Sequence, residues 1–258
     1  MSEEQHLAVV REQFAKQAED YSQMTVVRSE KLLTAVADAA GVGPSDRVLD
    51  VASGPGFLTM MLATRCREAV GVDATERFVE RARAEAARRG LANVTFRVGD
   101  VERLDLPSES FDAVTCKFAF HHFPRPANVL AEIVRVARPG AVVVLVDMVG
   151  SEDSARRDYQ DRIERLCDPS HASAIQASEF ERMFDALGLE VKAAHRTDTS
   201  YSLAEWLRHG GPSEESAREI EELMRASLDE DKSGLRVRIE NGELRFSHQG
   251  ATWVLRRT

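Results

Sequence analysis

The sequence predicts an α/β fold in a single domain, built around a mostly parallel sheet. Three observations lead to this expectation. Short apolar runs of strand length alternate with helical patterns through residues 47–148, which is typical of βαβ units. Several of these runs end in an acidic residue close to a glycine or a helix-capping residue. The chain has 258 residues, 43% of them hydrophobic and 30% charged, which suffices for one large core and is close to ordinary globular composition.

Residues 48–59 read Val-Leu-Asp-Val-Ala-Ser-Gly-Pro-Gly-Phe-Leu-Thr and carry the most information. The apolar start has the composition of a buried parallel strand, and Asp50 interrupts it ahead of a Gly-Pro-Gly turn at 54–56. A carboxylate is costly in such a strand unless it has a partner. The glycines let a ligand approach the backbone, and the helix that starts at Phe57 offers free N–H groups. The segment therefore predicts a strand end that faces a cationic ligand.

The elements that follow repeat this pattern. A second apolar strand over 68–73 ends at Asp73, with Thr75 as the cap of the next helix and Gly90 as its end. Three further strands are predicted over 94–98, 111–117 and 141–146, and they are followed by Asp100, Lys117 and Asp147 at or just beyond their ends. In a parallel α/β sheet the ligand crevice lies at these carboxyl ends.

Two known nucleotide-binding sequence patterns can be compared with the glycine turn. The dinucleotide fingerprint Gly-x-Gly-x-x-Gly fits poorly, because Thr59 stands at its third glycine and a proline lies between the first two. The segment instead resembles the Asp/Glu-x-Gly-x-Gly-x-Gly loop of class I S-adenosylmethionine-dependent methyltransferases, with Ala52, Gly54 and Gly56 at the three glycine positions. Residues 47–148 follow the element order of that family. They are most similar to small-molecule enzymes of the ubiquinone and menaquinone biosynthesis type.

The resemblance implies a Rossmann-like, mostly parallel seven-stranded sheet with an antiparallel last strand at its edge, plus helical lid insertions. It also implies S-adenosylmethionine as the cofactor, with Asp73 on the ribose hydroxyls and Asp100 and Val101 at the adenine. The residues expected to contact the cofactor are Tyr21, Asp50, Ala52, Ser53, Gly54, Gly56, Asp73, Ala74, Asp100, Val101, Lys117 and His122. Residues 14–21 match a stretch that similar enzymes use as a flap over the cofactor, although simple packing is an equal alternative. After Tyr21 the chain reads Ser-Gln-Met-Thr rather than the Asn-x-x-Met-Ser of quinone enzymes, which argues against a quinone substrate.

Histidines at the crevice are the candidates for acid–base chemistry, because histidine titrates near neutral pH. His121 and His122 directly follow the fourth strand, and we assign His121 to the substrate and His122 to the cofactor. His171, in an Asp-Pro-Ser-His loop, is a second candidate base, whereas His248 is expected to be structural. Two alternatives stay open. The histidines only hold their loops, or methyl transfer proceeds by alignment of the reacting atoms alone. Asp147 either contacts substrate or caps the next helix.

The composition of the chain argues against several classes of binding partner. The net charge is −9 and the basic residues are scattered, which argues against a nucleic-acid substrate. The apolar runs are far shorter than the ~20 residues of a membrane span, and the N-terminus does not resemble a signal peptide, so we expect a cytoplasmic protein without a membrane partner. Three widely spaced cysteines indicate neither disulfides nor a metal site. The expected partner is a small, fairly apolar metabolite, and the sequence makes no prediction of oligomeric state.

We divide the single domain into four parts. These are an N-terminal helical flap (1–44), a cofactor-binding core (45–148), helical cap insertions around a sixth strand (149–235), and a C-terminal hairpin with the edge strand (236–258). An Asn-Gly pair at 241–242 between strand-like runs predicts the hairpin. Two other functions remain. One is a cyclase or isomerase of the same fold in which S-adenosylmethionine is structural, and the other, disfavoured by the glycine turn, is an NAD-dependent oxidoreductase.

Overall fold

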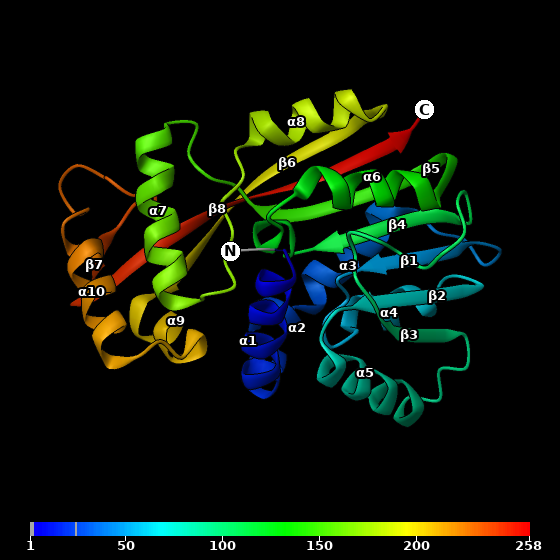
Figure 1. Cartoon of the computed structure of the whole chain (residues 1–258), viewed down its shortest axis with the longest axis horizontal. Helices are drawn as coiled ribbons and strands as arrows, with labels where there is room; N and C mark the ends of the chain where they lie inside the picture. The colour runs from blue at the N-terminus through cyan, green and yellow to red at the C-terminus, as the bar shows by residue number, and fades with distance from the viewer. Residues whose placement is uncertain (1–2, 24) are drawn as a thin grey trace.

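The computed structural model describes residues 3–23 and 25–258. One sheet runs through the molecule and extends at one end into a smaller lobe (Figure 1). Its strands are β1 (Arg47–Val51), β2 (Glu68–Asp73), β3 (Val94–Val98), β4 (Phe111–Lys117), β5 (Ala137–Met148), β6 (Leu189–Ser202), β7 (Arg238–Glu240) and β8 (Glu243–Arg257). The helices are α1 (Glu3–Gln23), α2 (Thr25–Arg28), α3 (Glu30–Ala40), α4 (Phe57–Ala63), α5 (Glu76–Arg88), α6 (Pro126–Val136), α7 (Ser154–Cys167), α8 (Ala177–Ala186), α9 (Leu203–Gly210) and α10 (Glu214–Arg225), with a short 3₁₀ helix η1 (Phe120–His122).

The strands lie in the order β3-β2-β1-β4-β5-β8-β6, and the short β7 pairs with β8. β3, β2, β1, β4 and β5 are parallel to their neighbours, whereas β8 is antiparallel to both β5 and β6. The predicted α/β class, the mostly parallel sheet and the antiparallel last strand are confirmed. The predicted hairpin is confirmed too: Asn241 and Gly242 both have positive φ, as a type I′ turn requires.

The predicted edge position of the last strand is wrong. β8 lies between β5 and β6, and β6 forms the edge. The side chains explain this arrangement: β8 buries Ala251, Trp253 and Leu255, whereas β6 is mostly exposed and carries charged residues such as Lys192 and Arg196. Charged side chains on an edge strand discourage pairing with another chain, so β6 suits the edge and β8 the interior.

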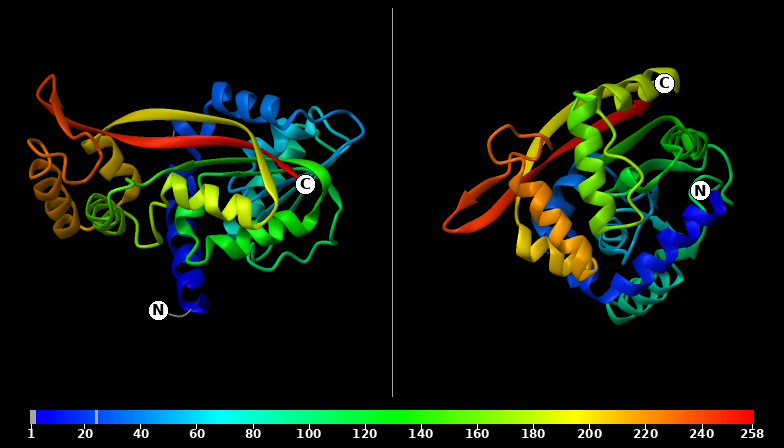
Figure 2. Two further views of the ribbon diagram at one scale, coloured as in Figure 1. Left: turned by 90° about the horizontal axis from the view of Figure 1, so that it is seen from above. Right: turned by 60° about the vertical axis from the view of Figure 1, so that its left-hand side comes forward.

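Apolar layers cover both faces of the parallel part of the sheet. Successive residues of a strand point to opposite faces, so Val48 packs toward α3 and α4 while Leu49 and Val51 pack toward α6 and α8. A separate apolar cluster forms where α7, α9 and α10 pack on the extended ends of β6 and β8 (Figure 2). We call these three helices, with the strand ends beneath them, the cap.

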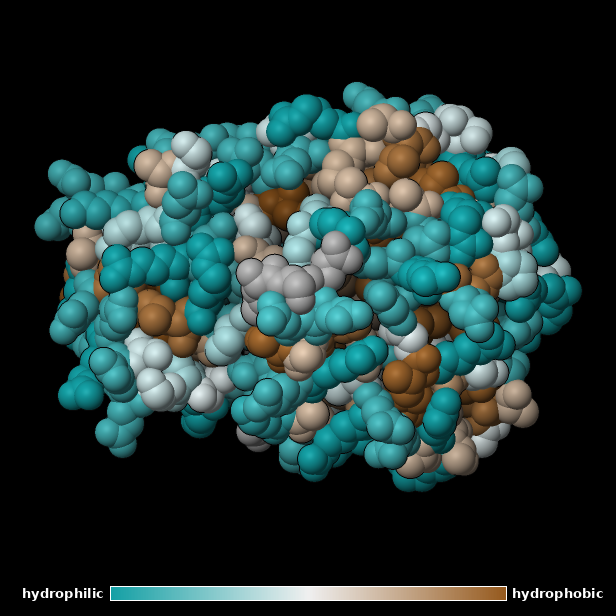
Figure 3. Space-filling view, viewed as in Figure 1, coloured by the Kyte–Doolittle hydropathy of each residue, from teal (hydrophilic) through white to brown (hydrophobic). Residues whose placement is uncertain are grey.

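Helix α1 lies between the two lobes in Figure 1 and contacts both. The Gln17 amide donates to the carbonyl of Gly210 at the end of α9, at 2.5 Å, and Glu19 forms an ion pair with Arg81 of α5. The face shown in Figure 3 is largely hydrophilic, with hydrophobic side chains in small separate patches. In the described part of the chain, no helix combines the length and apolar character needed to cross a bilayer.

Candidate functional site

The loop after β1 has the backbone that close ligand approach requires. Ala52, Gly54 and Gly56 have φ angles of +53°, +52° and +79°, so all three predicted glycine positions use the left-handed region. A Cβ on Gly56 would lie 2.6 Å from the Phe96 ring, whereas a Cβ on Gly54 would meet only Tyr21, at 3.9 Å. Gly56 therefore serves packing, and Gly54 leaves space above the loop.

Asp73 ties this loop to the end of β2. One carboxylate oxygen accepts the N–H of Gly54 at 2.7 Å, and the other accepts that of Thr75 at 2.8 Å. Burial raises the pKa of Asp73, and these hydrogen bonds oppose the rise. Because a carboxylate oxygen can accept more than one hydrogen bond, Asp73 can still receive hydroxyl groups from a ligand.

A cavity of about 490 Å³ opens at the carboxyl ends of the strands, with α1 along one wall. This volume is in the range of small-molecule sites. Eight of the predicted cofactor residues line it: Tyr21, Ala52, Gly54, Asp73, Ala74, Asp100, Val101 and His122. Phe14, from the stretch predicted as a flap, and Phe78, which the sequence interpretation did not assign, add aromatic walls, and their rings contact Tyr21.

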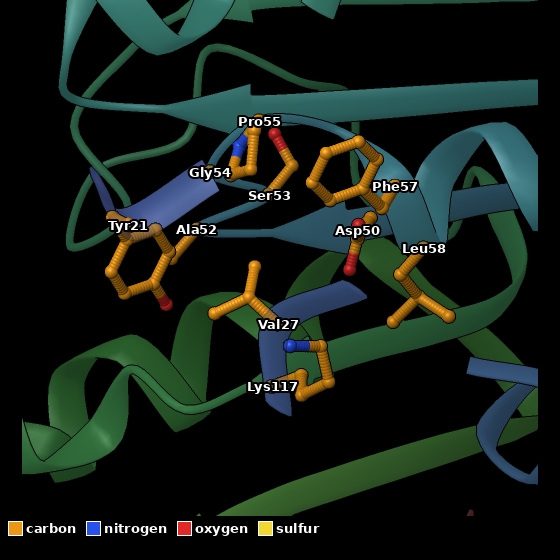
Figure 4. Close-up of a pocket in the computed structure, with 10 residues that line it drawn as sticks. All are labelled: Tyr21, Val27, Asp50, Ala52, Ser53, Gly54, Pro55, Phe57, Leu58 and Lys117. Carbon is orange, nitrogen blue, oxygen red and sulfur yellow. The ribbon is translucent and has the colours of Figure 1, made fainter. Parts of the chain in front are cut away.

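A second, narrower cavity lies beside the glycine loop and shares Tyr21, Ala52 and Gly54 with the first (Figure 4). Its other lining residues are Val27, Asp50, Ser53, Pro55, Phe57, Leu58 and Lys117. Asp50 accepts hydrogen bonds from the hydroxyls of Thr59 and Thr115, both at 2.7 Å, and burial raises its pKa to about 6. The Lys117 ammonium forms no hydrogen bond or ion pair within residues 3–23 and 25–258; burial lowers its pKa to about 8.

His121 is held by a buried carboxylate. Its Nδ1 lies 2.5 Å from Asp147, which also accepts the backbone N–H groups of Ala119, Phe120 and Met148. Burial lowers the pKa of His121, but the Asp147 carboxylate outweighs it, so the net pKa is raised. With Nδ1 donating to Asp147, Nε2 is left as the basic nitrogen, and it has no hydrogen-bond partner in the described chain. Asp147 does not cap the next helix, because Asp153 caps α7.

His122 faces the larger cavity. Its ring packs edge-on against Phe14, with 5.0 Å between centroids, and its Nδ1 donates to the Ser170 carbonyl at 3.2 Å. Burial, followed by the charges of His121 and His171, lowers the pKa of His122 well below its usual value. The ring is therefore neutral at neutral pH.

His171 lines neither cavity. Its side chain is 2% exposed, its Nε2 lies 2.8 Å from Asp161 of α7, and its ring centroid is 5.8 Å from that of His121. His121 is likewise absent from the lining of both cavities, and the two candidate bases differ in that the His121 side chain stays 16% exposed. His248 is also paired with an acid of α7, Glu164, at 2.7 Å. The three-residue spacing of Asp161 and Glu164 puts them on one helix face, but nothing in the sequence indicated their partners.

Comparisons with known proteins identify the family. A family model described as "Methyltransferase domain" matches residues 49–145. The uncharacterized methyltransferase YcgJ of Bacillus subtilis is 32% identical over 215 residues, which cover 83% of this chain and 85% of the relative. The solved structure of that protein superposes with a TM-score of 0.83 at 28% identity, covering 88% of this chain and 98% of the other. A demethylmenaquinone methyltransferase of Deinococcus radiodurans is 41% identical over 115 residues, or 44% of this chain and 47% of the relative.

The site fits the cofactor that this family uses. The left-handed loop leaves space above Gly54, the cavity beside Asp73 has the size for a nucleoside, and Lys117 offers an unpaired cation next to it. S-adenosylmethionine is the cofactor. From its glycine loop, its sheet order and its relatives, the chain belongs to the S-adenosylmethionine-dependent methyltransferases.

Proposed function

We propose that the protein methylates a hydroxyl oxygen or an acidic carbon of a small, fairly apolar metabolite, with His121 as the general base. The observation that carries this proposal is the His121–Asp147 pair. A hydroxyl or an acidic carbon must lose a proton on methylation, and a neutral imidazole whose Nδ1–H is held by a carboxylate presents Nε2 to receive it. His121 keeps 16% of its side chain exposed, whereas the His171 side chain is enclosed and serves in this proposal to support the His121 loop.

The predicted cofactor residues divide between the two cavities. Asp73 accepts the ribose hydroxyls, while Ala74, Asp100, Val101 and His122 surround the adenine side of the larger cavity. In the narrower cavity Asp50, Ser53 and Lys117 contact the other end of the cofactor, and loop positions 52 and 54 form the backbone cradle, whereas Gly56 lines neither cavity and packs against Phe96. Tyr21 lines both cavities, so its ring stands at their junction. When bound, the cofactor supplies a methyl group on a positively charged sulfur.

Apolar side chains of the larger cavity support an apolar acceptor. Leu7 and Val10 of α1 and Phe123, just beyond η1, line it beside His122. Such walls favour a ring or hydrocarbon group over an anion.

The test is a screen of phenols, small alcohols and carbon acids with S-adenosylmethionine, followed by mass detection of one added CH₂ unit. His121→Gln should lower turnover by ~10²–10⁴-fold, the usual contribution of a general base, and leave cofactor affinity unchanged in calorimetry. His195→Gln, an exposed histidine on β6, is the matched control. The wild-type rate should rise with pH as His121 loses its proton.

Two other outcomes would each contradict a different part of the proposal. A product of unchanged mass that forms only with bound cofactor would establish a cyclase or isomerase. If His121→Gln formed the methylated product at the wild-type rate, His121 would not be the general base, and alignment of the reacting atoms would be the mechanism.

A further inference from the structure

An irregular stretch of chain between α7 and α8, residues 170–174, lies against η1. Two backbone N–H groups of this segment, those of Ala172 and Ser173, both donate to the main-chain carbonyl of His121, at 2.8 and 3.2 Å. A carbonyl that accepts two N–H groups is restricted in direction. The 170–174 segment therefore fixes the backbone of the residue that we propose as the base.

A buried carboxylate, that of Asp161, holds the segment in shape. Asp161 lies on α7, and its side chain is 6% exposed. One oxygen accepts the Nε2–H of His171 at 2.8 Å and the N–H of Ala174 at 2.7 Å. The other oxygen accepts the hydroxyl of Ser173 at 3.0 Å. Buried polar groups outside helices and strands need partners of this kind, so the shape of the segment depends on Asp161.

His121 thus has two supports that act on different atoms. Asp147 holds the ring at Nδ1, while the 170–174 segment holds the main-chain carbonyl. Both supports are needed to fix the direction of Nε2, because a ring held at one atom can still turn when its backbone moves. Misplacement of a reacting group by ~1 Å can cost about 100-fold in rate.

We propose that Asp161 is a positioning residue for methyl transfer, which acts on His121 through the 170–174 segment. The inference rests on the proposed role of His121 as the general base. Asp161 lines neither of the two cavities, so it acts by geometry and not by contact with a ligand. Because Asp161 belongs to the cap and His121 follows β4 of the parallel sheet, the cap takes part in the reaction by aligning a residue of the other lobe.

His122 depends less on the segment. Its ring donates to the Ser170 carbonyl, but the ring also packs against Phe14, and the His122 carbonyl accepts a hydrogen bond from His6 of α1 at 2.8 Å. Loss of the shape of the segment should therefore reduce turnover and leave cofactor affinity nearly unchanged.

The experiment is a double-mutant cycle on the full chain, with the most rapidly methylated compound of the screen above as the acceptor. Asp161→Ala should lower kcat by ~10- to 100-fold, the scale of a misplaced reacting group, while calorimetry shows nearly wild-type affinity for S-adenosylhomocysteine. In a His121→Gln background the same substitution should add little further loss, because two changes that act through one group are not additive. Rates are compared on the upper plateau of the pH profile, where His121 is neutral, so that charge effects on its pKa do not enter.

Two variants separate geometry from charge and from general destabilisation. Asp161→Asn keeps an oxygen that can accept the hydrogen bonds of His171 and Ala174, so it should retain most of the turnover. Glu164→Gln changes a buried acid on the same face of α7 whose partner, His248, lies outside the segment, so kcat should stay near that of the wild type. If circular dichroism shows that Asp161→Ala does not fold, His171→Ala replaces it in the cycle. That variant removes one of the three hydrogen bonds and should give a smaller loss with the same lack of additivity.

Wild-type turnover of Asp161→Ala, or losses that multiply independently in the cycle, would overturn the inference and leave Asp161 a structural residue. Equal losses in Asp161→Asn and Asp161→Ala would also overturn it, because charge and not geometry would then be responsible. Normal turnover of His121→Gln alone, or a screen without a methylated product, would instead contradict the proposed function, so the two failures are distinguishable.

Discussion

The two sides of the crevice are built differently. On the cofactor side, the polar contacts join short stretches of chain: the glycine loop follows β1 directly, and Asp73 reaches back to Gly54 from the next strand. On the cap side, His248 is paired with Glu164, which lies 84 residues away in the sequence. The contact between Asp73 and the glycine loop therefore belongs to one compact motif, whereas the His248 pair forms only when distant parts of the chain have come together.

The electrostatics of the two sides differ in the same way. Burial raises the pKa values of Asp50 and Asp73 on the cofactor side, where no cation among residues 3–23 and 25–258 forms an ion pair with either carboxylate. On the cap side burial also acts against the charged forms, but histidine partners outweigh it and lower the pKa values of Asp161 and Glu164. The first set of charges is left for a ligand, and the second is satisfied within the chain.

The largest expected effect comes from Asp147. Asp147→Asn should lower turnover by ~10²–10⁴-fold, because a neutral amide no longer favours Nδ1–H on His121. Loss of the carboxylate also lowers the pKa of His121, so the rising limb of the pH–rate profile should move to lower pH. Cofactor affinity should hold in calorimetry. An Asp147→Asn enzyme with normal turnover would mean that the dyad only shapes the loop.

Substitutions of two glycines in the loop after β1 should affect different properties of the protein. Gly54→Val should lower S-adenosylmethionine affinity by more than about 100-fold while the circular dichroism spectrum stays native, because the side chain enters the ligand space at a φ of +52°. Gly56→Ala should instead cost ~1–3 kcal/mol of unfolding free energy through its contact with Phe96. Chemical denaturation and calorimetry on both variants give the comparison. If both variants lost the same affinity and the same stability, the separate roles of Gly54 in ligand binding and Gly56 in packing would be contradicted.

Acid should weaken the cap through Glu164. A carboxyl whose folded pKa is depressed contributes stability above its ordinary value of 4.5, and this contribution is lost as the pH falls through the folded pKa. The difference between thermal midpoints at pH 7 and pH 4 should therefore be smaller in Glu164→Gln than in the wild type, on a scale of ~2–4 °C per kcal/mol. An unchanged difference would show that the His248 pair contributes no net stability.

The smallest effect should come from Ala52. Its φ of +53° costs an alanine roughly 1 kcal/mol more than a glycine, partly offset by the greater freedom of glycine in the unfolded chain. Ala52→Gly should leave stability equal or higher by up to about 1 kcal/mol in urea denaturation, with cofactor affinity retained. A clear loss of stability would mean that the methyl group packs usefully despite the strain.

The sequence predicted what local patterns encode. Asp50, the left-handed loop and Asp73 lie where their spacing placed them, because strand–turn–helix geometry is determined by neighbouring residues. The edge position of β8 was predicted wrongly, since strand order depends on which strand can be buried on both sides. The Asp147–His121 and Glu164–His248 pairs had no local signature, because each joins side chains that only the finished fold brings together. The unpaired state of Lys117 likewise depends on both oxygens of Asp50 being occupied by threonines from other elements.

The interior position of β8 has a consequence for biosynthesis. The strand that connects β5 to β6 is the last of the eight to leave the ribosome. Until it arrives, the nascent chain exposes one open edge on β5, and β6 lacks β8, the strand with which it pairs. Non-local pairing of this kind slows folding and leaves strand edges available to other chains. Nascent chains stalled before residue 243 should therefore depend on chaperones, although their glycine loop and β1–β4 strands are already complete.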